Sequence, residues 1–305
     1  MGTTDKRVQF DFEIDFSNGG GIQGQGFRLD IDGDDIGDAA LADTIVRDLR
    51  LLMVGAVRIL NKQIIVERHK RAAGSVARDA AAAARHIDLS HAIEDGMITY
   101  KGLPAPIVCD HLSRVESRAH YAEGTEFQIG KLTMVANTGT YIDSPYHRFE
   151  NGKDIAGFDL DEVAGLDGVV VRVAGMRGRA IDRHAFLPID VHGKAVLVHT
   201  GWDRHWRSDR YFEGHPFLTA GAADHLRAAG ARLVGIDSLN IDDIADGHRP
   251  VDTTLLGAGI PIVEHLCGLE QLPVDGFRFS AVPVKVKGMG TFPVRAYATL
   301  DAVSS

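Results

Sequence analysis

The sequence predicts an α/β fold, because short apolar runs of strand length alternate with helical patterns over much of its 305 residues. Val169–Val173 and Ala195–His199 are almost continuously apolar, which is typical of strands covered on both faces of a sheet. A helical pattern from Thr219 to Ala229 precedes the strand-like run Leu233–Ile236. This order closes a β-α-β unit, so part of the sheet should be parallel, with a right-handed crossover.

The N-terminal part has a different pattern. Val8–Phe16 alternates apolar with polar, mostly acidic residues, which indicates a strand with one buried face. A second alternating run, Phe27–Ile31, follows the glycine-rich stretch Gly19–Gly26, so the two runs should form a β-hairpin. From Asp38 to about Val66 apolar residues recur at three- and four-residue spacing, which predicts one long amphipathic helix.

A segment rich in alanine and arginine, Arg71–Arg85, should be a helical or loose connector. We therefore expect two parts: an arm of hairpin and helix over residues 1–85, and a catalytic domain over residues 86–305. Two roles for the arm are open at this point. It could pack on a neighbouring subunit, or it could cover the core of the main domain.

Composition narrows the class of partner. The chain has 33 Lys and Arg against 42 Asp and Glu, a net charge of −9, and no basic cluster. Nucleic acids and anionic membranes need clustered cations, so a small molecule is the expected partner.

The N-terminal residues lack a secretory pattern and no apolar run approaches the roughly 20 residues of a membrane span, so we expect a cytoplasmic protein. Two distant cysteines, Cys109 and Cys267, indicate neither a disulfide framework nor a structural zinc site.

The stretch Asn137–His147, N-T-G-T-Y-I-D-S-P-Y-H, concentrates the residues that can carry chemistry. It follows the strand-like Phe127–Val135. Gly139 allows a backbone conformation closed to other residues and Pro145 fixes one dihedral angle, so the polar side chains between them can be held in place. Two interpretations are open from the residues alone: a tight turn whose Asp143 caps backbone amides, or an active-site loop.

The loop resembles the signature of the cyclase superfamily of bacterial kynurenine formamidase, isatin hydrolase and polyketide cyclase-like proteins, His-x-Gly-Thr-His-x-Asp-x-Pro-x-His. The resemblance covers residues 87 to about 300, without the N-terminal arm, and implies a mixed sheet curled into a barrel-like core with flanking helices, of the swivelling β/β/α type. The matching residues and segments, in chain order, are Ile87–His91, Gly139, Thr140, Asp143, Pro145, His147, His199–Trp202, Val234–Ser238 and Asp252–Glu264.

The resemblance also implies a site for one or two divalent ions, usually zinc or manganese. The ligand positions of the family hold Asn137, Tyr141, Asp143, Asp252 and Glu264 in this chain, so every imidazole is replaced. Zinc prefers nitrogen and sulfur ligands. The remaining carboxylates, with the amide carbonyl of Asn137, suit manganese, magnesium or calcium better. The alternative is a site without metal, in which Asn137 and Tyr141 bind the substrate by hydrogen bonds.

His147 keeps its family position, and the resemblance implies that it is the acid/base group for the attacking water and the leaving group. Imidazole suits this role because its unperturbed pKa of about 6.5 lets it take and give a proton near neutrality. Asp143 could orient His147, bind a metal, or do both. Glu264 lies in the apolar run Ile260–Leu266, where an ionised carboxylate is costly unless it is paired or metal-bound.

Three further residues are predicted to line the pocket. His199 and Trp202 come at the end of one predicted strand, and Asp237 follows another. Ligands of α/β sheets usually bind at such strand ends.

Three functions follow from these residues, in this order of preference. The first is hydrolysis of an amide, lactam or lactone bond in a small, arylformamide-like molecule, with His147 activating water and a divalent metal on Asp143, Asp252 and Glu264 if one binds. The second is a metal-independent cyclase, lyase or isomerase in which His147 and Tyr141 act as an acid/base pair. The third is a homologue that binds a small ligand without turnover. We also expect a homo-oligomer, a dimer or tetramer.

Overall fold

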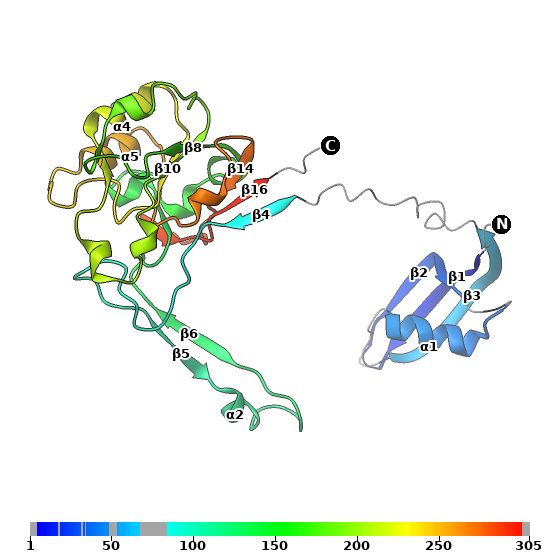
Figure 1. Cartoon of the computed structure of the whole chain (residues 1–305). Coiled ribbons are helices and arrows are strands. Elements are labelled where there is room, and N and C mark those ends of the chain that lie inside the picture. Colours follow the sequence, from blue (N-terminus) through cyan, green and yellow to red (C-terminus); the bar gives the residue numbers. More distant parts are fainter. Residues whose placement is uncertain are drawn as a thin grey trace. The chain divides into compact units, whose positions relative to one another are not determined.

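The computed structural model describes residues 5–17, 19–31, 33, 35–48, 54–67 and 84–300. The chain divides into two compact units, Met1–Ala81 and Ala82–Ser305 (Figure 1). Most of the predicted connector Arg71–Arg85 lies outside the described residues. No helix in the described ranges is long and apolar enough to cross a membrane.

The N-terminal unit is a three-stranded antiparallel sheet with one helix, α1 (Asp38–Asp48). Its strands lie in the order β2 (Gly21–Asp30), β1 (Asp5–Phe16), β3 (Val54–Glu67). The β1–β2 pair is the predicted hairpin, which the structure confirms. Every second side chain of β1 is buried, and Leu41 and Ile45 of α1 pack in the same core. The core members buried in this unit are Val8, Phe10, Phe12, Ile14, Leu41 and Ile45.

The prediction of one helix from Asp38 to Val66 is wrong, because the helix ends at Asp48 and β3 follows. The second half is rich in β-branched residues, which favour extended backbone. It also pairs along its whole length with β1. An irregularity near Asn61, which has a positive φ of 51°, shifts the register by one residue. Because of this extra residue, the apolar side chains of β3 do not recur at every second position, and their spacing resembles that of a helix.

The second unit is built on one nine-stranded mixed sheet, in the order β15-β7-β13-β12-β10-β8-β14-β16-β4. The four strands β8, β10, β12 and β13 are parallel and the remaining pairs are antiparallel. The strands are β4 (Arg85–Asp88), β7 (Tyr141–Asp143), β8 (Leu166–Arg172), β10 (Ala195–His199), β12 (Leu233–Ile236), β13 (Ile262–Glu264), β14 (Phe277–Ser280), β15 (Thr291–Pro293) and β16 (Tyr297–Leu300).

The predicted α/β arrangement is confirmed in this unit. Strands β10 and β12 have the predicted bounds and pair in parallel. The helix between them, α4 (Ala220–Ala228), begins after Thr219, whose Oγ1 accepts the backbone N–H of Ala222 at 3.2 Å. The other helices are α2 (Arg114–Ser117), α3 (Leu160–Val163) and α5 (Pro250–Gly257), and a separate short parallel pair is formed by β9 (Ala180–Ile181) and β11 (Phe217–Leu218).

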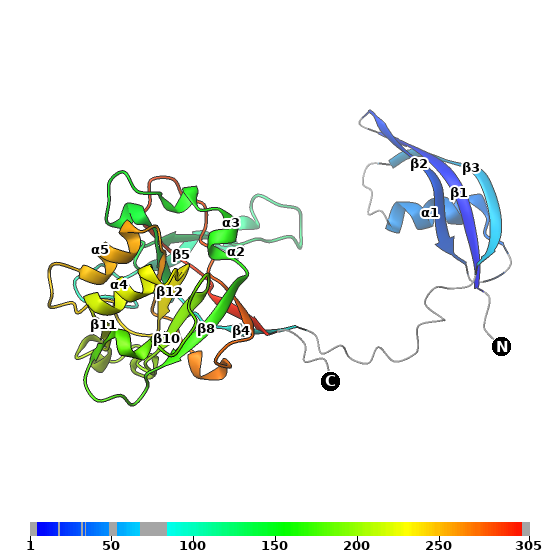
Figure 2. The same cartoon turned by 90° about the horizontal axis from the view of Figure 1, so that it is seen from above.

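Two apolar cores lie on the two faces of this sheet. One face packs against α4 and α5, which lie side by side over the parallel strands (Figure 2). On the other face, Ile87 of the last strand β4 shares one core with Ile142 of β7 and Val263 of β13, near the opposite end of the sheet. The sheet therefore curls around this core into a half-barrel, as the resemblance implied.

A two-stranded ribbon extends from the second unit (Figure 1). It consists of β5 (Ile107–Leu112) and β6 (Ile129–Thr133), and nearly all of its side chains are exposed. Val108 and Leu132 lie opposite each other and are 48% and 49% exposed. A two-stranded ribbon is marginally stable alone. We therefore expect another copy of the chain to cover it in the homo-oligomer, which stays a prediction.

The double substitution Val108→Lys/Leu132→Lys tests this expectation, because charges on an apolar interface disfavour association. We expect the mass from light scattering to fall from that of a dimer or tetramer to that of a monomer. Leu187→Lys, at an exposed position outside the ribbon, is the control and should leave the mass unchanged. An oligomer that survives the double substitution would show that the ribbon is not the interface.

Candidate active site

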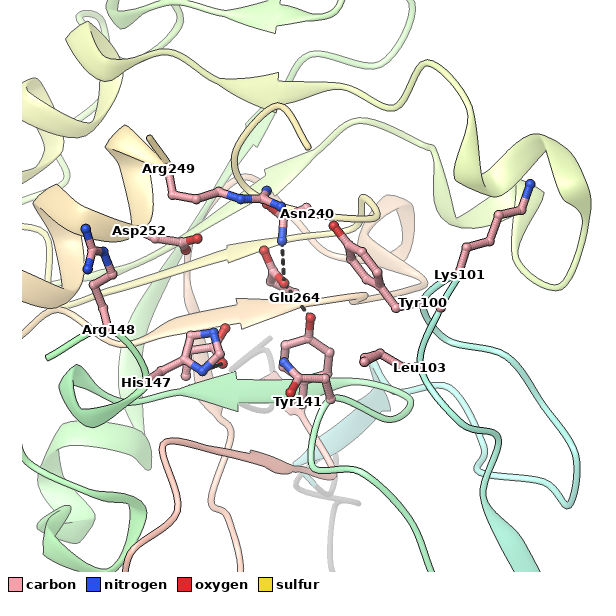
Figure 3. A pocket seen from close by; sticks show the side chains of 13 residues that line it. Tyr100, Lys101, Leu103, Tyr141, His147, Arg148, Asn240, Arg249, Asp252 and Glu264 are labelled. Atoms are coloured by element: carbon pink, nitrogen blue, oxygen red, sulfur yellow. Dashed lines mark hydrogen bonds and ion pairs between the residues drawn. The ribbon is translucent and has the colours of Figure 1, made fainter. Parts of the chain in front are cut away.

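A cavity of about 500 Å³ opens beside the strands β7 and β13 and the start of α5 (Figure 3). It brings together six of the residues singled out in the sequence, from segments more than 100 residues apart. Those six are Asn137, Tyr141, Asp143, His147, Asp252 and Glu264.

The antiparallel pairing of β7 with β13 places Tyr141 opposite Glu264. The Tyr141 hydroxyl donates to Glu264 Oε2 at 2.6 Å, and Asn240 Nδ2 donates to the same oxygen at 3.2 Å. The other oxygen, Oε1, accepts the backbone N–H of Ile241 at 2.6 Å. Glu264 is therefore buried with both oxygens bonded. Its burial, together with the Asp143 carboxylate, raises its pKa to about 8.

The pairing of β15 with β7 places Thr291 opposite Asp143. The Thr291 hydroxyl makes a short hydrogen bond to Asp143 Oδ1. The hydroxyl oxygen of Thr291, Oγ1, also lies 2.9 Å from His147 Nδ1. When Asp143 is ionised, Thr291 donates to it, so its oxygen accepts the Nδ1–H of His147. This arrangement leaves the lone pair on Nε2. Burial and the nearby Arg249 lower the pKa of His147, so the imidazole is neutral at pH 7.

Asp252 lies in the first turn of α5. The Asp242 carboxylate fixes this turn, because it accepts the backbone N–H groups of Val251 and Asp252, each at 2.9 Å. Burial, followed by repulsion from Glu264, Asp143 and Asp242, raises the pKa of Asp252 to about 9. A carboxyl group with this pKa keeps its proton at neutral pH and can donate it.

Tyr141 is buried, and its hydroxyl is already bonded to Glu264. Burial, with Glu264 and Asp143 nearby, raises its pKa well above the ordinary value. A phenol in this state is a weak acid, and its conjugate base is not formed near neutrality. The predicted catalytic role of Tyr141 as a proton donor or acceptor therefore has little support in this geometry.

The predicted metal site on Asp143, Asp252 and Glu264 is not formed. Within the described ranges, no group of three or more His, Cys, Asp or Glu is arranged to hold a metal ion. The donor chemistry agrees, because the Tyr141 hydroxyl and the Asn240 amide direct protons toward Glu264, where a metal would need free lone pairs. The residues present thus do not fit the zinc or manganese site that the resemblance implied.

His199, Trp202 and Asp237 do not line this cavity. His199 Nδ1 lies 3.1 Å from Arg172 Nη1, and Trp202 Nε1 donates to the carbonyl of Tyr211 at 3.0 Å. Asp237 accepts three hydrogen bonds, from Thr200 N, Thr200 Oγ1 and Gly201 N, at 2.6 to 2.8 Å. All three lie at or just after strand ends as predicted, but none of them lines the cavity, and Asp237 instead holds the turn after β10.

Asp237→Asn is expected to lower the free energy of unfolding by about 1–3 kcal/mol, because an amide N–H₂ would face one of the three donors. Both tryptophans, Trp202 and Trp206, lie in the second unit, so urea unfolding followed by their fluorescence reports on that unit alone. A stable variant that binds cavity ligands more weakly would instead place Asp237 in contact with the ligand.

Seven of the lining residues were missed in the sequence, among them Tyr100, Asn240 and Arg249. Asn240 follows β12, and Arg249 precedes Pro250 at the start of α5. The position of Asn240 after a predicted strand was a usable signal. Nothing in the local sequence pattern indicated Tyr100 or Arg249, whose positions depend on how distant loops meet.

Comparison with known proteins agrees with this fold. The model of the family described as "Putative cyclase" matches residues 87–243. Kynurenine formamidase of Geobacillus thermodenitrificans is 28% identical over 212 residues, 69% of this chain and 95% of the relative. Kynurenine formamidase of Bacillus cereus is 26% identical over 211 residues, with the same coverage.

Two solved structures are also similar. Isatin hydrolase A from Labrenzia aggregata, bound to benzyl benzoate, has a TM-score of 0.62 and 20% identity, over 73% of this chain and 96% of its own. A structure titled as a potential metal-dependent hydrolase with cyclase activity has a TM-score of 0.59 and 26% identity, over 71% and 98%. The family resemblance that began with the loop Asn137–His147 is confirmed.

Proposed function

Because this chain belongs to the cyclase family, we propose that it hydrolyses the C–N bond of a formamide or cyclic amide in a small aromatic molecule. The names of its relatives support this class of reaction. The cavity of about 500 Å³ is large enough for a molecule with one or two rings.

The observation that carries the proposal is the placement of His147. Its Nδ1 is held by Thr291, which is held in turn by Asp143, and its pKa is lowered. A neutral imidazole whose orientation is fixed through one nitrogen can accept a proton from water at the other. Attack of that water on the amide carbonyl forms the new C–O bond and breaks the C–N bond.

The remaining lining residues supply the other parts of the reaction. The Asn137 amide can donate a hydrogen bond to the carbonyl oxygen as negative charge develops on it. The leaving nitrogen needs a proton, and Asp252, with a pKa of about 9, holds one at neutral pH. No step is assigned to a metal ion, since the donor set does not fit one.

Incubation of the full chain with formanilide and with isatin tests the proposal. We expect release of aniline, opening of the isatin ring, or both, at a rate that changes less than about twofold after dialysis against EDTA. Loss of activity in EDTA with recovery on adding Mn²⁺ or Zn²⁺ would contradict the metal-free chemistry. Absence of turnover for both compounds, with retained ligand binding, would favour the non-catalytic homologue.

The lyase or isomerase reading, with His147 and Tyr141 as an acid/base pair, has less support. Tyr141 is bonded to Glu264 and its pKa is raised. It could act only if Glu264 released it first.

A further inference from the structure

Asn240 lines the cavity in a fixed orientation, and the proposed hydrolysis gives it no part. It follows β12, and its side chain is buried. Its Oδ1 accepts two hydrogen bonds, from Arg249 Nη1 at 2.8 Å and from the backbone N–H of Asp242 at 3.0 Å. An amide oxygen only accepts and an amide nitrogen only donates, so these two donors decide which end of the side chain is the nitrogen.

Arg249 holds this orientation from the start of α5. It lies immediately before the helix, with a left-handed φ of 50° that non-glycine residues rarely adopt, and the turn directs its side chain across the cavity to Asn240 (Figure 3). The guanidinium also makes a hydrogen bond with the Tyr100 hydroxyl, so it is held between two residues of the cavity. A charged donor on Oδ1 polarises the Asn240 amide, which makes its N–H groups stronger donors.

The Asn240 amide nitrogen has one N–H without a partner. Nδ2 donates to Glu264 Oε2 at 3.2 Å, whereas an amide nitrogen carries two hydrogens. Among the residues that the structure describes, no second acceptor bonds Nδ2. Because Asn240 lines the cavity, this hydrogen is available to a ligand there. Buried polar groups are nearly always paired, so a fixed and unused N–H indicates an acceptor that the ligand supplies.

We propose that Asn240 is a catalytic residue, whose second Nδ2–H binds the oxyanion that forms when water attacks the amide carbonyl. As the water oxygen bonds to the carbonyl carbon and its proton moves to His147, the π pair of the carbonyl moves onto its oxygen. A donor that is fixed beforehand stabilises this charge without reorganisation. The pair then re-forms the carbonyl, the C–N bond breaks, and the nitrogen takes the proton of Asp252. The inference rests on the proposed function and adds a donor to that of Asn137.

Asn240→Asp tests this role, because aspartate keeps the shape and the bonded oxygen and loses both N–H groups. We expect kcat for formanilide to fall by about 10²- to 10³-fold, the effect typical of one lost oxyanion donor, with KM changed less than about threefold. Asn240→Ala should give a similar fall. Arg249→Met leaves the amide with one anchor and should lower kcat by about tenfold at unchanged KM, and Arg249→Lys should restore most of it.

Asn151→Asp is the matched control, because Asn151 is exposed, lies outside the cavity and undergoes the same change of charge. It should leave kcat unchanged. Thermal unfolding shows whether each variant keeps its fold, and Arg249→Met keeps the inference testable if the Asn240 variants do not. A folded Asn240→Asp or Asn240→Ala that retains more than a tenth of the wild-type kcat would overturn the inference. An unchanged kcat in Arg249→Met would overturn the positioning role of Arg249.

Infrared spectroscopy separates this inference from the proposed hydrolysis. In His147→Ala, which should bind formanilide without turnover, the stretch of an isotope-labelled formyl carbonyl reports on hydrogen bonds to its oxygen. We expect this band at lower frequency in the protein than in buffer, and at higher frequency again in His147→Ala/Asn240→Asp. That result without turnover in the wild type would retain Asn240 as a donor and reject the hydrolase. Turnover in the wild type, with the same band in both variants, would retain the hydrolase and overturn the inference.

Discussion

His147→Ala is expected to lower kcat for an N-formyl arylamine by about 10²- to 10⁴-fold, the contribution typical of a general base. The substitution removes the only imidazole that lines the cavity within the described ranges. KM should change little, because His147 takes the proton of the water and is not needed to hold the substrate. Steady-state kinetics on the variant and the wild type provide the measurement.

His184→Ala is the matched control for this substitution. His184 is an exposed histidine, with a side chain that is 73% accessible, and it lies outside the cavity. Its loss should leave kcat unchanged. If His147→Ala retained more than a tenth of the wild-type kcat, another group would have to activate the water and the proposed mechanism would fail.

Thr291 allows a finer test of the same mechanism, since it acts through His147 as a positioning residue. Thr291→Val keeps the shape but removes the hydroxyl that links Asp143 to His147. We expect a fall in kcat of about tenfold with unchanged KM, and Thr291→Ser should restore most of it. A purely structural role would not respond to return of the hydroxyl in this way.

The site could be predicted from the sequence where it depends on one continuous segment. The loop from Asn137 to His147 carries its geometry in Gly139 and Pro145, and four of its polar residues line one cavity. Glu264 was also accessible to sequence reasoning, because a carboxylate in an apolar run must meet a partner. The pairing of β7 with β13 brings Tyr141 to Glu264, and a loop distant in sequence brings Asn240 to it, so the sequence did not identify these partners.

The failures have three physical causes. One extra residue near Asn61 interrupts the alternation of side chains along β3, so the local pattern predicted a helix where the structure has a strand. Position at the end of a strand did not decide what a side chain contacts, since His199 and Asp237 do not line the cavity and bond Arg172 and Thr200 instead. Arg249 depends on a strained backbone that sequence spacing does not reveal.

Replacement of the family's imidazoles also changes the electrostatics of the cavity. A metal ion would neutralise several carboxylates. Here burial, followed by mutual repulsion of the carboxyl groups, raises the pKa of Glu264 to about 8 and that of Asp252 to about 9, so these groups retain protons together near neutral pH. Hydrogen bonds between neutral acids, amides and a phenol thus hold the site together, in place of metal coordination.

Glu264→Gln tests this arrangement through stability. Glu264 has an ordinary pKa near 4.5 and a folded-state value of about 8, so its neutral form is favoured in the native protein. Between these values the unfolded chain ionises while the folded chain keeps the proton. The wild type therefore loses up to about 1.4 kcal/mol of stability per pH unit as pH rises from 5 to 8. Glutamine has the shape of the neutral acid and does not titrate.

The amide N–H₂ of this glutamine faces one of the donors that bond Glu264, which costs about 1–3 kcal/mol at every pH. On top of this constant loss, we expect the stability of Glu264→Gln relative to the wild type to rise by about 2–4 kcal/mol between pH 5 and pH 8. Urea unfolding at intervals of one pH unit, followed by tryptophan fluorescence, measures the difference. Glu270→Gln, at an exposed carboxylate outside the cavity, should show no such trend. A stability difference between Glu264→Gln and the wild type that stays the same from pH 5 to pH 8 would mean that the pKa of Glu264 is not raised in the native protein, and it would contradict this arrangement.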